Sequence, residues 1–214
     1  MSTDTVAVLL WDCDGVLQHG HFDWRERLDR TVAPGFAHKV FKAELPALRG
    51  ERSLHAVLTD LLEQESPSGE LPVTVADLLA IWEQFDLDRE AIELVQEVRR
   101  LGVRCLLATN QQDHRVRLMR QVHGYDDFVD GAYWSSLIGA MKPDPAFFEH
   151  ILDDLGLPGE QVGFVDDVPA NVASARALGI RAVLHEPSSG AAGLRQAIQP
   201  LVPELANPGS DPAR

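Results

Sequence analysis

The stretch VAVLLWDCDGV, residues 6–16, joins an apolar run to two aspartates and a glycine. The run from Val6 to Trp11 is continuous and rich in β-branched residues, which is typical of a parallel strand that is covered on both faces. Parallel α/β sheets bind their ligands outside the carboxyl ends of the strands. We therefore expect Asp12 and Asp14 to lie at the edge of a buried sheet, where two carboxylates so close together need a chemical reason.

The pattern of this strand recurs downstream, and helical periodicity separates the copies. In residues 88–102, apolar side chains recur at helical spacing, with Asp88 as the expected N-cap, and residues 144–156 have Asp144 as cap and Gly156 as stop. Alternating strands and helices predict an α/β fold, a Rossmann-like parallel sheet flanked by helices. The further expected strands are 103–109, 130–136, 161–165 and 180–184, and the further expected helices are 112–124 and 169–179.

Residues 18–86 interrupt this alternation with two apolar helical stripes, one from Leu54 to Leu62 and one from Val75 to Trp82. Thr74 and Asp77 have the spacing of a capping box at the start of the second stripe. We expect a core of residues 1–17 and 87–204, a small all-helical insertion at 18–86, and a disordered tail at 205–214.

The composition narrows the class of protein. A chain of 214 residues with 45% hydrophobic and 24% charged residues can bury a globular core. The formal charge of −14 argues against non-specific binding of nucleic acid. No apolar run is long enough to span a membrane, and the N-terminal stretch lacks the basic region of a signal peptide, so a cytoplasmic protein with two reduced cysteines is expected.

A second acidic pair, Asp166 and Asp167, also follows a buried strand directly. Other close pairs, such as Asp153 and Asp154, fall in helices or turns and are interpreted as solvated surface. Four carboxylates gathered at one sheet edge repel one another unless a cation lies between them. The simplest prediction is a hard divalent ion, Mg²⁺, bound by oxygen ligands.

Two further strand ends carry residues suited to an anion. Thr109 and Asn110 stand where the strand 103–109 gives way to a helix, a position that offers a hydroxyl and backbone amides. Lys142 stands just before a helix that begins with proline. Either feature alone has an ordinary structural explanation, as helix cap or surface charge. Their order at successive sheet edges favours one shared site.

At these residues the chain resembles the haloacid dehalogenase-like hydrolase superfamily, in its phosphatase-type members. The motifs that carry the resemblance are DCDGV at 12–16, Thr109 in LLATN, Lys142 in MKPDP and GFVDD at 163–167, followed by NVASARALG. The resemblance implies a magnesium-dependent phosphatase that acts on a small phosphorylated metabolite. The insertion has the position of that family's mobile cap, although no cap motif is recognisable in it.

The resemblance also implies residue roles. Asp12 would be the nucleophile that forms an aspartyl phosphate, and Asp14 the general acid and base. Thr109, the Asn110 amide and Lys142 would hold the phosphoryl oxygens. Magnesium would be bound by the Asp12 carboxylate, the Asp14 backbone carbonyl and Asp166, with Asp167 direct or through water: metal ligands Asp12, Asp14, Asp166 and Asp167.

Several alternatives stay open at this level. Relatives that cleave carbon–halogen bonds lack an aspartate at position 14, so dehalogenation is not expected. A sugar phosphomutase shares that aspartate, but the residues after the first motif do not match the mutase pattern. A non-catalytic binding or regulatory protein on the same fold is a third reading. The physiological substrate, with a mild preference for a sugar phosphate, the oligomeric state and the contributions of His19, His21, Lys39, Lys42 and Arg49 are undetermined by sequence.

Overall fold

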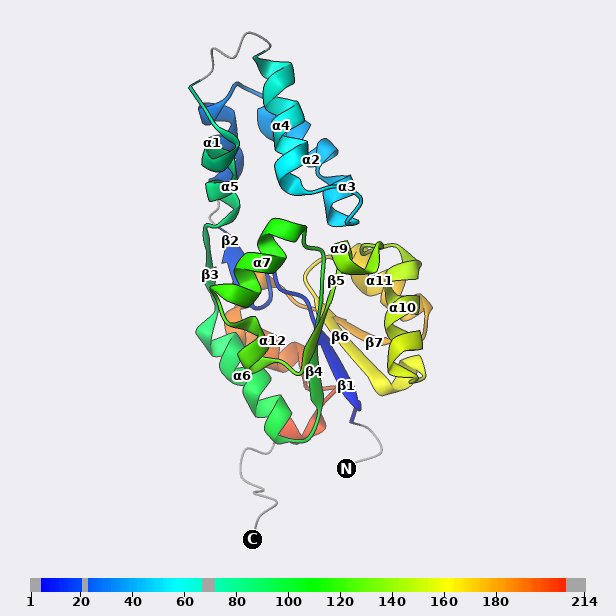
Figure 1. Cartoon of the computed structure of the whole chain (residues 1–214). Coiled ribbons are helices and arrows are strands. Elements are labelled where there is room, and N and C mark those ends of the chain that lie inside the picture. Colours follow the sequence, from blue (N-terminus) through cyan, green and yellow to red (C-terminus); the bar gives the residue numbers. More distant parts are fainter. Residues whose placement is uncertain (1–4, 21–22, 67–71, 207–214) are drawn as a thin grey trace.

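The computed structural model describes residues 5–20, 23–66 and 72–206 (Figure 1). Within these residues, five parallel strands form one sheet in the order β5-β4-β1-β6-β7. The expected strands are all present, so the predicted α/β class is confirmed. Their bounds are Val8–Trp11 (β1), Arg104–Thr109 (β4), Gly131–Trp134 (β5), Val162–Asp166 (β6) and Arg181–Leu184 (β7).

The first strand lies at the centre because it is apolar on both faces. Every residue of β1 is buried, and β1 pairs with β4 on one side and with β6 on the other. Its register sets Trp11 beside Leu107 and Val165, so the three strands end at the same edge. This alignment brings the residues that follow β1, β4 and β6 together.

Helices cover both faces of the sheet, as Figure 1 shows. On one face, buried residues of α6, α7, α8 and α12 pack against Leu9 and Trp11; on the other, α10 and α11 pack against Val8 and Leu10. The bounds are Arg89–Arg100 (α6), Asp113–Gln121 (α7), Tyr125–Phe128 (α8), Ser135–Ile138 (α9), Pro145–Leu155 (α10), Pro169–Ala177 (α11) and Gly190–Ile198 (α12), with 3₁₀ turns at Gly159–Gln161 (η1), Pro187–Ser189 (η2) and Pro203–Ala206 (η3).

Local caps begin and end these helices where the sequence predicts. Asp88 accepts a hydrogen bond from the Ala91 amide at the start of α6, and Asp144 accepts one from the Ala146 amide at the start of α10. Gly156 ends α10 with a left-handed φ of 63°. At the other end of the chain, Leu205 is buried in the core as part of η3, and residues 207–214 of the expected tail lie outside the described residues.

The insertion folds as helices with an apolar centre of their own. The two predicted stripes are α4 and α5, and the capping box between Thr74 and Asp77 is present. The sequence reading missed three more helices, because each is short and none of them begins with a side-chain cap. The insertion helices are Trp24–Thr31 (α1), Phe36–Ala43 (α2), Leu45–Leu48 (α3), Leu54–Glu65 (α4) and Val75–Trp82 (α5).

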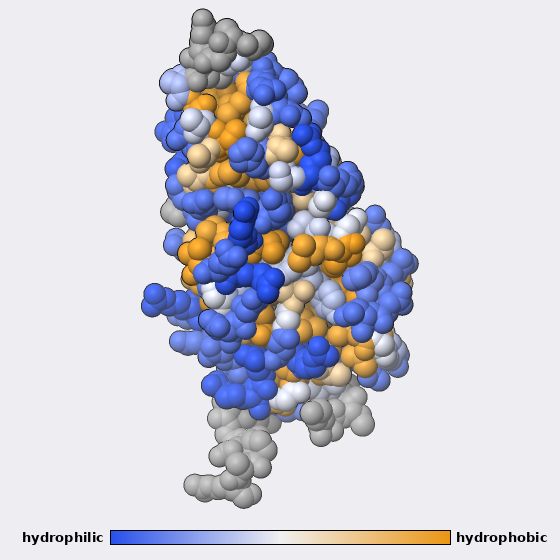
Figure 2. Space-filling model, in the orientation of Figure 1, coloured by the Kyte–Doolittle hydropathy of each residue, from blue (hydrophilic) through white to orange (hydrophobic). Residues whose placement is uncertain are grey.

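Two short strands join the insertion helices to the core. Gln18–Gly20 (β2) and Phe85–Leu87 (β3) pair antiparallel, so the chain leaves and re-enters the core side by side. In Figure 1 the insertion helices stand over the edge of the sheet at which β1, β4 and β6 end. Hydrophilic residues dominate the face drawn in Figure 2, with apolar patches on the insertion and at its junction with the core. None of the described helices combines the length and the apolarity that a membrane span requires.

Candidate active site

The loop after β1 carries the first two candidate residues. The Cys13 carbonyl accepts hydrogen bonds from the amides of Val16, Leu17 and Gln18, at 3.1, 2.8 and 3.0 Å, which closes a tight turn. Gly15 has a left-handed φ of 79°, and a Cβ there would lie 2.3 Å from Oδ2 of Asp167. Glycine is therefore required both by the turn and by the close approach of the loop that follows β6.

The end of β4 and the segment before α10 are fastened to each other. The Asn110 side chain donates to the Lys142 carbonyl and accepts from the Lys142 amide, both at 2.8 Å. This two-way clasp fixes the backbone of Lys142 against the carboxyl end of β4. Thr109 is the last residue of β4 and is buried, and its hydroxyl lies 3.4 Å from the side-chain nitrogen Nε2 of Gln111. Sequence positions 109, 110 and 142 thus meet at one edge.

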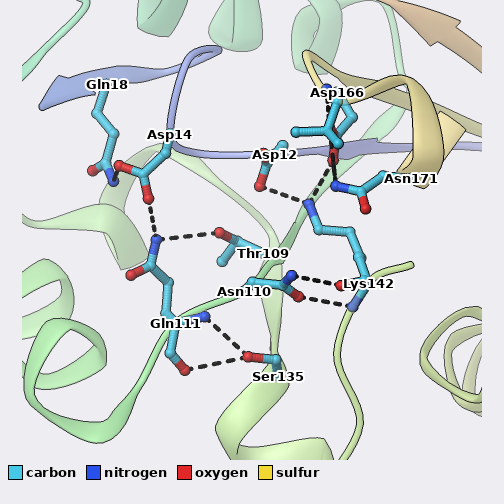
Figure 3. A network of polar contacts seen from close by, with 11 residues as sticks. Asp12, Asp14, Gln18, Thr109, Asn110, Gln111, Ser135, Lys142, Asp166 and Asn171 are labelled. Carbon is cyan, nitrogen blue, oxygen red and sulfur yellow. Dashed lines mark hydrogen bonds and ion pairs between the residues drawn. The ribbon is translucent and has the colours of Figure 1, made fainter. Parts of the chain in front are cut away.

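Lys142 is a buried cation between two carboxylates (Figure 3). Its Nζ lies 2.7 Å from Oδ1 of Asp12 and 2.6 Å from Oδ2 of Asp166. Burial by itself lowers the pKa of Lys142, but the two carboxylates more than reverse this and raise it. Burial raises the pKa of Asp12 to about 7, although the Lys142 charge lowers it. Because a buried charge is costly without a partner, the two ion pairs hold Lys142, Asp12 and Asp166 in place.

Asp166 is the most enclosed of the carboxylates. It accepts hydrogen bonds from the Val168 amide at 2.7 Å and from the Asn171 side chain at 3.1 and 3.0 Å, in addition to Lys142. Asn171 lies on α11 and is the first residue of NVASARALG, a stretch that carries part of the family resemblance. No role was predicted for this residue from the sequence. Several donors to one carboxylate fix its orientation.

Three carboxylates meet closely enough to share a metal ion. Oxygens of Asp12, Asp166 and Asp167 all lie within 4.8 Å of one another. Burial and the charge of Asp166 raise the pKa of Asp167 to about 6. Lys142 supplies one positive charge against these three acids, so the cluster is left with an excess of negative charge. An all-oxygen donor set with this excess fits a hard divalent cation such as Mg²⁺.

The Asp14 carboxylate lies apart from this cluster, contrary to the expectation that four carboxylates meet. Figure 3 shows it turned toward Gln18 and Gln111, whereas Asp12 points to Lys142. It accepts hydrogen bonds from Gln18 at 2.8 Å, Gln111 at 2.6 Å and Arg115 at 2.9 Å. The chain bends directly after Asp12, so the rule that residues i and i+2 share a face no longer applies.

The partners of Asp14 were missed by sequence reasoning. Gln111 directly follows the Thr109-Asn110 motif, but nothing in its local pattern marks its target. Arg115 belongs to α7, is nearly buried, and its guanidinium lies 4.2 Å from the centre of the Phe85 ring on β3. Tyr125 donates its hydroxyl proton to Gln18, which in turn contacts Asp14.

All the core candidates surround one cavity of about 300 Å³ or lie at its base. Asp12, Asp14, Thr109, Asn110, Lys142 and Asp167 line it, together with Gly15, Val168 and Asn171. The fully buried Asp166 lies behind Lys142. The cavity therefore joins carboxylates, a hydroxyl and a cation in a space suited to a small tetrahedral anion.

The candidates in the insertion and its connection do not line this cavity. His19 lies 3.2 Å from Asp88 through its Nε2, and Lys39 forms an ion pair with Glu65. Lys42 and Arg49 are exposed. His21 lies outside the described residues.

The chain is similar to proteins named as phosphatases. Sesquiterpene phosphatase astK of Aspergillus oryzae is 33% identical over 93 residues, 44% of this chain and 47% of that protein. Phosphatase MT3486 of Mycobacterium tuberculosis is 34% identical over 113 residues, 52% of this chain and 51% of that protein. The chain thus spans about half the length of these curated relatives.

A similar fold occurs in a solved enzyme. The HAD family enzyme bt-2542 from Bacteroides thetaiotaomicron matches with a TM-score of 0.73 and 21% identity, over 86% of this chain and 95% of that one, and its magnesium complex matches with a TM-score of 0.72. A family model described as haloacid dehalogenase-like hydrolase matches residues 6–179. The chain belongs to the haloacid dehalogenase-like hydrolase family.

Proposed function

We propose that the protein is a magnesium-dependent phosphatase that hydrolyses a small phosphorylated metabolite through an aspartyl-phosphate intermediate. The observation that carries the proposal is the Asp12 carboxylate at the wall of the 300 Å³ cavity, paired with buried Lys142 and close to Asp166 and Asp167. A carboxylate can attack a phosphate dianion only where nearby cations offset the negative charge of both.

In the first step, an oxygen of Asp12 attacks phosphorus and the bond from phosphorus to the leaving oxygen breaks. Asp14 gives its proton to that leaving oxygen, so the alcohol departs neutral. In the second step, water attacks the phosphorus of the aspartyl phosphate, Asp14 takes the water proton, and the bond to Asp12 breaks. Inorganic phosphate is released, and both aspartates return to their starting states.

The other residues of the cavity hold the transferring group. Thr109 offers a hydroxyl and Asn110 its backbone amide, beside the N-terminus of α7, where backbone donors favour an anion. Lys142 contributes positive charge at the nucleophile, and its clasp with Asn110 keeps it there. Gln111, Gln18 and Arg115 orient Asp14.

Three clustered carboxylates are candidates to bind magnesium. The carboxylates of Asp12, Asp166 and Asp167 would hold the ion, with the Asp14 backbone carbonyl as a further oxygen ligand. When bound, magnesium would shield the anionic nucleophile from the anionic phosphate and stabilise charge on the phosphoryl oxygens. The magnesium complex of a structural neighbour supports this choice of ion.

The insertion would act as a cap, with residues 1–17 and 87–204 as the catalytic core and 18–86 as the cap domain. Its helices stand over the sheet edge that carries the site (Figure 1). The names of the curated relatives include a sesquiterpene phosphatase, whereas family resemblance alone favours a sugar phosphate. The charge of −14 opposes binding of nucleic acid, so a small molecule is the expected substrate.

The test is phosphate release from p-nitrophenyl phosphate and a panel of sugar, nucleotide and lipid-like phosphates, with magnesium or with EDTA. Wild type is compared with Asp12→Asn and with Asp153→Asn, an exposed aspartate on α10, as the matched control. We expect magnesium-dependent release in wild type and in the control, and none in Asp12→Asn.

Three other outcomes would reject the proposal. Release that is equal in Asp12→Asn would remove Asp12 as nucleophile. A sugar bisphosphate that accumulates in ³¹P NMR would indicate a phosphomutase, and absence of turnover across the panel would favour a binding or regulatory protein.

A further inference from the structure

A second cavity shares Asp14 with the phosphate site. It has a volume of about 640 Å³, and Asp14 lines both cavities. Its remaining walls come mainly from the insertion helices: Trp24, Phe41, Glu44, Ile81 and Trp82. This volume is within the range of sites for drug-sized ligands and about twice that of the phosphate cavity.

The position of Asp14 assigns a role to this cavity. If Asp14 protonates the leaving oxygen, as the proposed function requires, that oxygen lies between the transferring phosphorus and the rest of the substrate. With the phosphoryl group in the smaller cavity, the organic leaving group extends past Asp14 into the larger one. Arg115, which holds Asp14, lines the same space.

Much of the wall is aromatic. The rings of Trp24 and Phe41 meet edge to face with centroids 4.7 Å apart, and the Arg25 guanidinium lies 5.3 and 4.9 Å from the two ring centres. Phe41 is 40% exposed although it is large and apolar. Unfilled aromatic surface beside a catalytic group is suited to burying an apolar body.

One polar group stands out in this wall. The Glu44 carboxyl accepts a hydrogen bond from Trp82 Nε1 at 3.1 Å, and within the described ranges it has no ion-pair partner. Burial raises the pKa of Glu44 to about 7, although Trp82 and the charge of Arg115 lower it. An acidic group without an ion-pair partner in a partly apolar cavity favours a ligand that supplies a hydrogen-bond donor.

We propose, on the basis of the proposed function, that this cavity selects a leaving group with an extended apolar body and one hydrogen-bond donor, a hydroxyl or an ammonium, that pairs with Glu44.

The test uses alkyl phosphates of two to eight carbons, each plain, with a terminal hydroxyl or with a terminal amine. We expect kcat/KM to rise with chain length, by up to about fourfold per buried methylene. At the best length, a terminal donor is expected to add about tenfold. Glucose 6-phosphate and phosphoglycolate serve as polar and anionic comparisons, and a higher kcat/KM for either would overturn the proposal.

Variants test which residues cause the dependence on chain length and on the terminal donor. Glu44→Gln is expected to abolish the advantage of the amine but to keep much of that of the hydroxyl, since the amide oxygen still accepts; this distinguishes the two donors. Phe41→Ser is expected to weaken the dependence on chain length. The controls are Glu51→Gln and Leu45→Ser, exposed insertion residues that line neither cavity. Equal effects in variants and controls would overturn the proposal.

Binding separates this inference from the proposed function. The affinity of the same alkyl phosphates is measured by calorimetry, without turnover. If no phosphate ester is hydrolysed but affinity rises with chain length and falls in Glu44→Gln, the cavity assignment stands and the phosphatase proposal fails. If affinity is independent of chain length, the cavity assignment is wrong, whatever the enzyme hydrolyses.

Discussion

Replacing Gly15 by alanine is expected to disturb the metal site and to leave the rest of the active site intact. A Cβ at this position would lie 2.3 Å from Oδ2 and 2.7 Å from Cγ of Asp167. The carboxylate is the mobile end of a side chain, so it must retreat by about 1 Å to an ordinary separation. That movement takes one of three clustered carboxylates out of position while leaving the Asp12–Lys142 pair unchanged.

A second glycine, Gly179, provides a control for the loss of stability that the Gly15→Ala substitution causes. Gly15 and Gly179 have φ values of 79° and 82°, but a Cβ on Gly179 meets nothing within 4 Å. A left-handed alanine costs about 1–2 kcal/mol in either place. For a chain of this size each kcal/mol lowers Tm by about 2–4 °C, so both variants should lose roughly 2–8 °C.

Only Gly15→Ala should also weaken magnesium binding, by about tenfold or more, the scale typical of disturbed metal-site geometry. The assay is Tm with and without magnesium, followed by the magnesium concentration for half-maximal phosphate release. Ligand that binds only the folded state raises Tm, so the first readout does not depend on turnover. An equal magnesium response in Gly15→Ala and Gly179→Ala would refute the assignment of Asp167 to the metal site.

Two further predictions concern the clasp at the site and the support of β4. Asn110→Ala removes both hydrogen bonds to the Lys142 backbone, so we expect kcat to fall by about tenfold or more with little change in Tm; an unchanged kcat would show that the ion pairs alone position Lys142. Burial acts to raise the pKa of Asp130, but hydrogen bonds from Arg99 and the Cys105 amide lower it below the ordinary 3.8. Folding therefore favours the charged form of Asp130. Its contribution to the free energy of unfolding is complete above pH 3.8 and is lost as the pH falls through the lower pKa of the folded state. In urea titrations, wild type should exceed Asp130→Asn in midpoint at pH 7 and lose that advantage toward pH 3, and a difference independent of pH would contradict this assignment.

Much of the fold could be predicted from local pattern. Apolar runs such as residues 6–11 form central strands because a strand buried on both faces has no polar alternation, and caps such as Asp88 and Asp144 satisfy the first amides of their helices within a few residues. The carboxylates of Asp12 and Asp166 were predictable as neighbours for the same reason, since parallel strands align their carboxyl ends. The short insertion helices were not, because their stability depends on packing against one another.

The sequence by itself determined which residues reach the edge of the sheet: each candidate follows directly on a strand or precedes a helix, and these are local properties of the chain. Only the tertiary structure decided what those residues do there. Asp14 is turned from the carboxylate cluster by Arg115, which is 101 positions away, and the second cavity is formed by helices whose contacts, such as that of Trp82 with Glu44 across 38 positions, have no local signature. Hydrogen bonds and ion pairs depend on distance and angle, and for partners this far apart only the folded chain sets either.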